Sequence, residues 1–264
     1  MTRPNAVVQH GGMLVPGLGY ALVELADFVP PPGHSTGFRC LDERGLIQPG
    51  SVWTLATSAA VGATTFAVQV ALAACRTGKV LPVNGHMSSH LLLQRVEDAL
   101  VRDDQINHKV ARARIELCSQ LGFPPQGDRL GRRWVASGYD LIIVDTMDES
   151  FLPEAAPATS EQWLRELRWW RDLARGNNTA LLLTARVPSP QDAGSESFRR
   201  EWAKHLARPV FEDISDVRME MYETTDTPLA VTAYRRGLGW WFGRGGLARS
   251  AGSELRLRTA SGDE

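Results

Sequence analysis

The chain has 264 residues, with 29 lysines and arginines against 30 aspartates and glutamates, so its formal net charge at pH 7 is −1. This length suits one sizeable domain with extensions, and the balanced charge excludes a basic surface spread over the whole protein. Three widely spaced cysteines without a CxxC pair exclude a disulfide framework and predict a cytoplasmic protein. No apolar run in the sequence is long enough to cross a membrane.

The order of apolar and polar residues predicts an α/β domain. Residues 1–36 end in PPPGHSTG and are predicted to be an N-terminal extension or linker. Strands are predicted at 51–57, 79–84, 139–145, 179–185, 216–224 and 228–236, and helices at 64–76, 88–101, 107–122 and 161–175. Such alternation predicts a mostly parallel central sheet with helices on both faces. We expect this domain to span 37–245 and a C-terminal tail to follow at 246–264.

The segment after the first predicted strand has the order strand, tight turn, helix that a phosphate-binding loop needs. In the spacing G-x-x-x-x-G-K-[ST], Thr57 takes the first glycine position, Gly62 the second, Ala63 the lysine and Thr64 the magnesium-binding hydroxyl. Together with Thr65, these residues are the predicted nucleotide-binding set. Because Gly62 and Thr64 alone match the pattern, the segment by itself is more typical of an ordinary strand, turn and helix, in which Gly62 permits the turn.

The surrounding sequence resembles the ATPase domain of the DnaB-type replicative helicases, hexameric motors with a RecA-like P-loop NTPase fold. The resemblance begins in TGFRCLDERGLIQPGSVWTLATSAAVGATTFAVQVALAA and continues in GKVLPVNGHMSSHLLLQRV. It extends through YDLIIVDTMDE, which resembles the Walker B strand, to TALLLTARV, ARPVFEDI and AVTAYRRGLG. The resemblance implies a RecA-like fold, ATP with magnesium as cofactor, and assembly of the chain into a ring or filament.

Several catalytic groups of that family are replaced in this chain. By the resemblance, the phosphate lysine falls on Ala63, the water-polarising glutamate on His86, the sensor glutamine near Ala185, and the lysine of the arginine-finger element on Ala233. Asp145 remains as the magnesium-ordering carboxylate, with Thr64 as its partner, and Arg235 as the arginine finger. Loss of the lysine should weaken nucleotide binding by roughly tenfold to a hundredfold, and loss of the general base should slow hydrolysis by about 10² to 10⁴.

Arginines in predicted loops are the candidate contacts for single-stranded DNA. By the resemblance they would line a central channel and contact the DNA backbone. They are Arg132, Arg133, Arg186, Arg199 and Arg200. The pairs Trp169–Trp170 and Trp240–Trp241 suggest base stacking, but the helical spacing around Trp170 favours a core position.

The sequence therefore predicts a catalytically degenerate DnaB-helicase-like protein with weak or no ATP hydrolysis. Its expected role is in DNA replication, repair or mobile-element maintenance, through homo-oligomer assembly and contacts with DNA or with replication and repair proteins. One alternative is an active ATPase or helicase in which Lys79 or Arg76 replaces the missing phosphate charge. Another is a ring- or filament-forming scaffold without a nucleic-acid role, which the near-neutral charge favours.

Overall fold

The computed structural model of the protein describes residues 32–43, 45–57, 62–84, 87–102, 106–119, 134, 137–145, 160–186, 213–222, 230–235, 239–249 and 255–259. The chain divides into two units, Met1–Pro32 and Gly33–Glu264, and almost all described residues lie in the second. Within these described ranges, no helix has both the length and the apolarity needed to cross a membrane.

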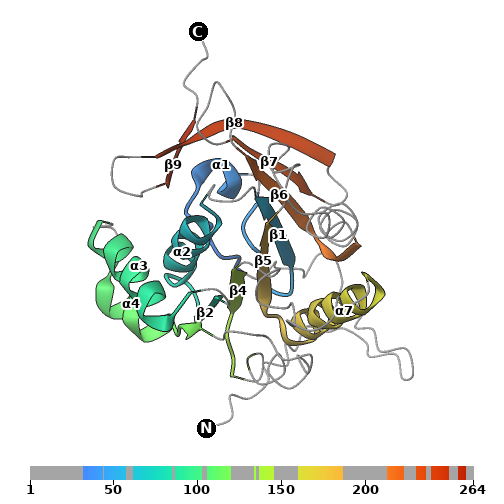
Figure 1. Ribbon diagram of the computed structural model, residues 1–264, viewed down its shortest axis with the longest axis horizontal. Helices are drawn as coiled ribbons and strands as arrows, with labels where there is room; N and C mark the ends of the chain where they lie inside the picture. The colour runs from blue at the N-terminus through green and yellow to red at the C-terminus, as the bar shows by residue number, and fades with distance from the viewer. Residues whose placement is uncertain are drawn as a thin grey trace, which may run out of the picture. The chain divides into compact units, whose positions relative to one another are not determined.

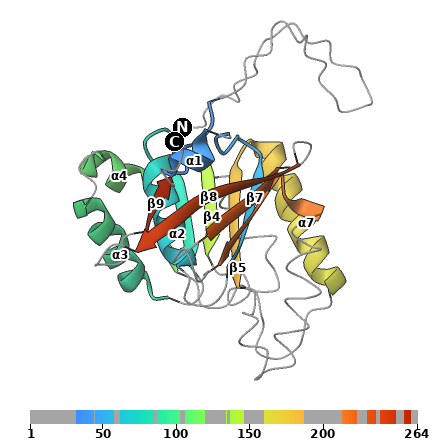
Figure 2. The same cartoon turned by 90° about the horizontal axis from the view of Figure 1, so that it is seen from above.

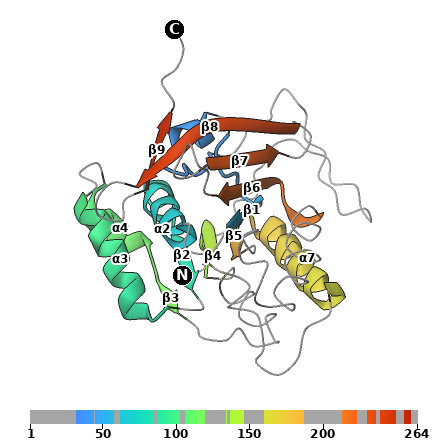
Figure 3. The ribbon, with the colours of Figure 1, turned by 45° about the horizontal axis from the view of Figure 1, so that its top comes forward.

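The described strands form a nine-stranded sheet in the order β3-β2-β4-β5-β1-β6-β7-β8-β9 (Figure 1). From β3 to β6 the neighbours are parallel, and from β6 to β9 they are antiparallel (Figure 3). The strands are β1 (Val52–Thr57), β2 (Val80–Asn84), β3 (Cys118–Ser119), β4 (Leu141–Asp145), β5 (Ala180–Arg186), β6 (Val217–Tyr222), β7 (Ala230–Arg235), β8 (Gly239–Arg249) and β9 (Leu255–Thr259). The mostly parallel α/β architecture predicted from the sequence is confirmed.

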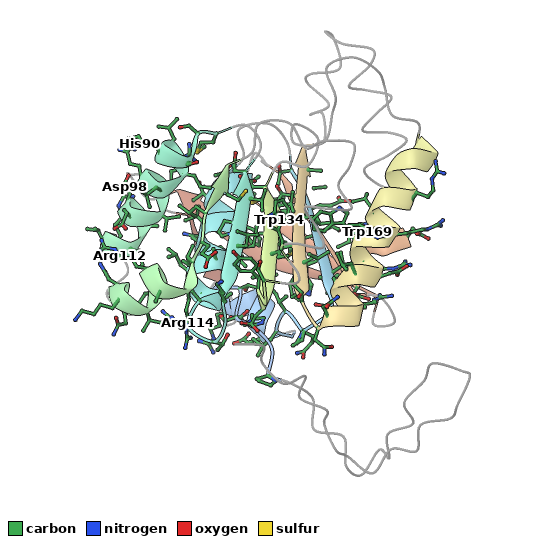
Figure 4. The ribbon with its side chains drawn as sticks, turned by 90° about the horizontal axis from the view of Figure 1, so that it is seen from below. His90, Asp98, Arg112, Arg114, Trp134 and Trp169 are labelled. Carbon is green, nitrogen blue, oxygen red and sulfur yellow. The ribbon has the colours of Figure 1, made fainter. Side chains whose placement is uncertain are left out.

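Helices cover the parallel part of the sheet on both faces (Figure 2). The helices are α1 (Arg39–Asp42), α2 (Ala63–Ala74), α3 (Ser89–Arg102), α4 (His108–Arg114) and α7 (Ser160–Asn177). Arg112 and Arg114 on α4 lie on the opposite side of the sheet from Trp169 on α7 (Figure 4). Every residue of β1, β2 and β4 is buried, as expected of parallel strands enclosed between two helical layers.

The sheet separates two hydrophobic cores, one on each of its faces. On the α2 face, Trp53 and Leu55 of β1 pack in one cluster with Phe66 of α2. On the α7 face, Val52 and Ala56 of β1 pack in a second cluster with residues of α7 that include Leu167, Trp170 and Ala174. Because successive strand residues alternate between faces, these clusters assign each strand position to one side of the sheet.

The N-terminal motif of the domain is held by a local hydrogen-bond network. The carboxylate of Asp42 accepts bonds from the Ser35 hydroxyl at 2.5 Å, the Thr36 amide at 2.8 Å and the Thr36 hydroxyl at 2.7 Å. Phe38 stacks on Phe66 of α2 with 4.9 Å between ring centroids. The residues that carry the resemblance at this end of the domain therefore fasten the chain to α2.

Two segments differ from the sequence-based expectation. The helix predicted at 107–122 ends at Arg114, because Ile115 forms a parallel bridge with Val80 and Cys118 pairs with Val83 at the edge of the sheet. The segment 246–264, expected to be a tail, contributes the end of β8 and the whole of β9 to the sheet. In both places strand pairing replaces the structure that local pattern favoured.

Candidate functional site

The candidate nucleotide site begins where β1 leads into α2. Thr57 ends the strand, and α2 starts at Ala63 after Gly62, whose φ of 108° and ψ of 29° place it in the left-handed region. Glycine adopts this conformation without a steric penalty, which explains its presence at the turn. Residues 58–61 of the predicted loop lie outside the described residues. The first turn of α2, with Thr64 and Thr65, directs its backbone amides toward this end of the sheet.

Four polar residues follow the apolar positions of neighbouring strands at the same edge. They are Asn84 on β2, Asp145 on β4, Thr184 on β5 and Thr57 on β1, and each is at most 3% exposed. Strand alternation places all four on the α2 face, because Leu55, Ile143 and Leu182 belong to the core cluster on that side. The carboxyl ends of parallel strands thus gather polar groups beside the start of α2, where open α/β sheets bind ligands.

Asp145 is held by hydrogen bonds from both flanking strands. The Asn84 side-chain amide donates to Oδ2 at 2.7 Å, and the Thr184 hydroxyl donates to Oδ1 at 2.9 Å. Asn84 is itself oriented by the backbone amide of Met87, which donates to its Oδ1 at 2.8 Å. The carboxylate predicted to order magnesium therefore accepts bonds from neutral donors on both of its oxygens.

The hydroxyl of Thr57 is a buried polar group at the end of β1. Thr57 is 1% exposed, and its Oγ1 has no hydrogen-bond partner among the residues that the structure describes. Burying an unsatisfied hydroxyl is unfavourable. With neighbouring strands about 4.8 Å apart and β5 between β1 and β4, Thr57 lies about 10 Å from the strand of Asp145.

The two cations considered as replacements for the phosphate lysine lie at the opposite edge of the sheet. Lys79 precedes β2, and its Nζ contacts Glu116 Oε1 at 2.7 Å and the Tyr139 ring at 4.4 Å. Arg76 follows α2, a helix of 12 residues and therefore about 18 Å long. Both side chains are thus separated from the start of α2 by the length of an element, which excludes them as substitutes within one chain.

The remaining predicted site residues are described only in part. His86, Arg132, Arg133, Arg199 and Arg200 lie outside the described residues. Arg235 ends β7 and pairs in register with Val217, and Arg186 ends β5 and pairs with Thr57. For Arg186 and Arg235, these pairings describe the backbone only.

The tryptophan pair of α7 is part of the core. Trp170 is 2% exposed and packs against Trp134, with ring centroids 5.7 Å apart, and Trp169 meets the edge of Trp170 at 5.8 Å. The core position favoured for Trp170 is confirmed, and this residue is not available to stack on a base.

Asn84 and Thr184 were missed by the sequence-based site prediction. Asn84 carried a signal, because a buried apolar strand that ends in a polar residue places that residue at the carboxyl edge of a parallel sheet, whereas Thr184 lies two residues before the end of β5. The same signal pointed to Asp145, at the end of LIIVD. Which of these side chains bond to one another depends on strand order, and β5 enters the sheet between β4 and β1 although it follows both in the chain.

A magnesium ion does not fit this network as it stands. Each oxygen of Asp145 already accepts a bond from a neutral donor, and the donor at Oδ2 is an NH₂ group that has no lone pair to offer an ion. Magnesium is bound through carboxylate oxygens, phosphates and water, and it needs oxygen lone pairs that face the ion. The Asn84 amide instead directs a hydrogen toward the carboxylate.

Comparisons with known proteins identify the fold. No family model matches the chain, and no curated protein matches it. A DnaB-like replicative helicase, whose structure was described with its interactions with primase, is similar at a TM-score of 0.63 and 13% identity, over 88% of this chain and 63% of that chain. The chain thus spans less than two thirds of that helicase.

Two further solved structures are similar over nearly their whole length. The RadB recombinase matches at a TM-score of 0.56 and 20% identity, over 85% of this chain and 99% of that chain. A KaiC-like protein from the hyperthermophilic archaeon Pyrococcus horikoshii OT3 matches at 0.62 and 14%, over 87% and 100%. At these identities the likeness shows the fold, which is RecA-like α/β.

Proposed function

We propose that this RecA-like chain is a catalytically degenerate relative of the DnaB-type motors. It binds nucleotide weakly, hydrolyses it slowly or not at all, and acts in DNA replication, repair or mobile-element maintenance through assembly and contacts with DNA or protein. One of the similar structures is a replicative helicase described with primase, and another is a recombinase. Both similarities support our proposal that this chain acts in a process that involves DNA.

The observation that carries the proposal is the retained frame of the phosphate site without its lysine. The left-handed Gly62, the start of α2 and the buried Asp145 occupy the same edge of the sheet, while position 63 is alanine. The amides and the dipole at the start of a helix favour an anion without any side-chain charge. A charge-assisted bond from lysine contributes about 1.5 to 3 kcal/mol, so its absence weakens nucleotide binding without abolishing it.

Contacts with DNA are proposed to be weak and directed at the backbone. The candidate arginines Arg132, Arg133, Arg186, Arg199 and Arg200 are dispersed along the sequence, and the net charge of −1 provides no general attraction. Binding that rests on a few phosphate contacts decreases steeply as salt increases. We therefore expect any affinity for single-stranded DNA to be detectable at low salt and lost near physiological salt.

The test is to restore the lysine. Ala63→Lys should strengthen ADP binding by roughly tenfold to a hundredfold, as measured by isothermal titration calorimetry, because the added ammonium meets phosphates at the start of α2. Phosphate release by the unmodified protein should be negligible. The matched control is Gln94→Lys, which adds the same charge on an exposed position of α3 and should leave ADP affinity unchanged.

Each alternative function gives a different result in the same assays. Robust ATP turnover by the unmodified protein would replace the proposal with an active ATPase that uses an unusual phosphate grip. If Ala63→Lys folds and gains no affinity, the turn at Gly62 does not present its amides to phosphate. Together with an absence of single-stranded DNA binding at low salt, that result would favour a scaffold.

A further inference from the structure

The side-chain amide of Asn84 donates a hydrogen bond to Oδ2 of Asp145, the carboxylate predicted to order magnesium. We infer that Asn84 is a positioning residue that excludes magnesium from this site, so that any phosphate ligand of the unmodified protein binds without a divalent metal. This inference rests on the proposed function for the ligand, but the role of Asn84 can be measured with a metal alone. Introducing a carboxylate at position 84, or removing the amide there, should open the site to metal.

The orientation of the Asn84 side chain is fixed by its neighbours. An asparagine side chain presents an oxygen on one side and an NH₂ group on the other, and the surrounding hydrogen bonds decide which is which. The Met87 amide can only donate, so the atom that faces it at 2.8 Å is the oxygen. The NH₂ group therefore faces Asp145 Oδ2, at 2.7 Å.

Asn84 differs from Thr184 in what it can offer the carboxylate. The Thr184 hydroxyl, 2.9 Å from Oδ1, can rotate and either donate or accept. The Asn84 NH₂ group can only donate, and it cannot turn away without breaking its bond to Met87. A cation gains nothing from this group, because the NH₂ nitrogen offers no lone pair and directs its hydrogens outward, so Asn84 is the element of the network that opposes metal binding.

Burial strengthens this effect. Asn84 is 0% exposed and Asp145 is 3% exposed, so solvent does not compete for the bond between them. A hydrogen bond to a charged acceptor in a low-dielectric environment is stronger than one in water. A metal ion must therefore compete with this bond for Oδ2 of Asp145.

The test compares metal binding by three variants and the unmodified protein. Asn84→Ser removes the NH₂ group, Asn84→Asp replaces it with a carboxylate of the same shape that still accepts from Met87, and Thr184→Val removes the hydroxyl and leaves Asn84 in place. Mn²⁺ serves as the probe, and free Mn²⁺ is counted by electron paramagnetic resonance, first alone and then with ADP. Near-ultraviolet circular dichroism and melting temperature report folding.

We expect Asn84→Ser and Asn84→Asp to bind Mn²⁺ at least roughly tenfold more tightly than the unmodified protein, which is the factor that one charge-assisted bond represents. Thr184→Val should show no such gain. Adding Asp145→Asn to Asn84→Ser should remove the gain, because the carboxylate is then absent. ADP affinity of the unmodified protein should be the same with magnesium and with EDTA.

Two results would overturn the inference. One is tight Mn²⁺ binding at Asp145 in the unmodified protein, or ADP binding that magnesium strengthens tenfold or more. The other is an absence of gain in every folded variant at position 84. If no variant binds ADP, the nucleotide part of the proposed function fails, while the measurements with Mn²⁺ alone still decide the role of Asn84.

Discussion

His34 lies buried where the N-terminal motif meets the end of α2. It is 5% exposed, and its Nδ1 lies 2.9 Å from the Thr77 hydroxyl. Burial lowers the pKa of His34 below its ordinary value of 6.5, and the charge of Asp140 opposes that effect. The folded protein therefore takes up a proton at this position less readily than the unfolded chain does.

This shift predicts that the protein loses stability in weak acid. As the pH falls below about 6.5, the unfolded chain gains the proton first, so the free energy of unfolding decreases until the folded form is also protonated. Urea unfolding between pH 7.5 and pH 5 should show this decrease, and His34→Gln should reduce it. The control is His90→Gln on the exposed side of α3. Equal pH dependence in all three proteins would contradict the prediction.

Individual residues differ in how far the sequence could predict their role. The order strand, turn, helix placed Gly62 at the turn and began the helix at residue 64, one residue after the observed start of α2 at Ala63. The strand that ends in Asp145 was visible as a continuous apolar run. The bonds from Asn84 and Thr184 were not predictable, because they form between strands that are 61 and 39 residues away from Asp145 in the chain.

At the scale of elements, α2 is a buried helix that receives side-chain hydrogen bonds at its C-terminal end but has no side-chain cap at its N-terminal end. The two carbonyls that directly follow the helix accept bonds from the Arg114 guanidinium of α4, at 3.0 Å from Cys75 O and 2.6 Å from Arg76 O. At its N-terminus, Gly62 provides no side-chain cap. A cation at a helix C-terminus is stabilising, so α4 secures the end of α2 that lies away from the candidate site.

Removing this guanidinium should destabilise the domain. We expect Arg114→Met, which keeps much of the side-chain volume, to lower the free energy of unfolding by about 1 to 2 kcal/mol, as measured by urea unfolding. The control is Lys109→Met, which removes a cation from an exposed position of the same helix and should have an effect within about 0.5 kcal/mol. If the two variants lose the same stability, the carbonyl contacts are not responsible.

The predictability of each element followed its burial. Strands enclosed on both faces, such as YDLIIVD, and the amphipathic helix α7 were found close to their observed bounds, since apolar pattern is the main local signal. The short β3 was hidden in a basic segment that is typical of a helix, and its pairing with β2 decided its conformation. Strand β9 carried an alternating pattern in LRLRT that was too short to stand out beside a polar tail.

At the scale of the molecule, the sheet joins a parallel half that carries the candidate site to an antiparallel half made by β7, β8 and β9. The strand that ends in Arg235 belongs to the antiparallel half, and the strand that ends in Asp145 belongs to the parallel half. Between them in the sheet lie β5, β1 and β6, so the two residues end strands that are far apart. We therefore propose that Arg235, as an arginine finger, acts on the site of a neighbouring protomer.

Assembly is the property of the whole molecule that the proposed function needs. The resemblance to ring-forming motors predicts that the N-terminal segment docks on a neighbouring protomer, and YALVELADF is its apolar stretch. Deleting residues 1–30 should therefore convert an oligomer to a monomer in light scattering. Deletion of 260–264, which follow the last strand of the sheet, is the control and should leave the oligomeric state unchanged. A monomer before and after the N-terminal deletion would contradict this prediction.

The bonds of Asp42 have a consequence for how chains of this kind are recognised. Thr36, Phe38 and Asp42 hold the start of the domain against α2 through contacts that involve no nucleotide. Substitutions at these three positions would lower the stability of the fold, whereas position 63 already holds an alanine. A sequence motif that contains the first group therefore reports on the fold, whereas the residues at the phosphate loop report on the chemistry. Chains found by such a motif should be sorted first by the residues at positions 63 and 86.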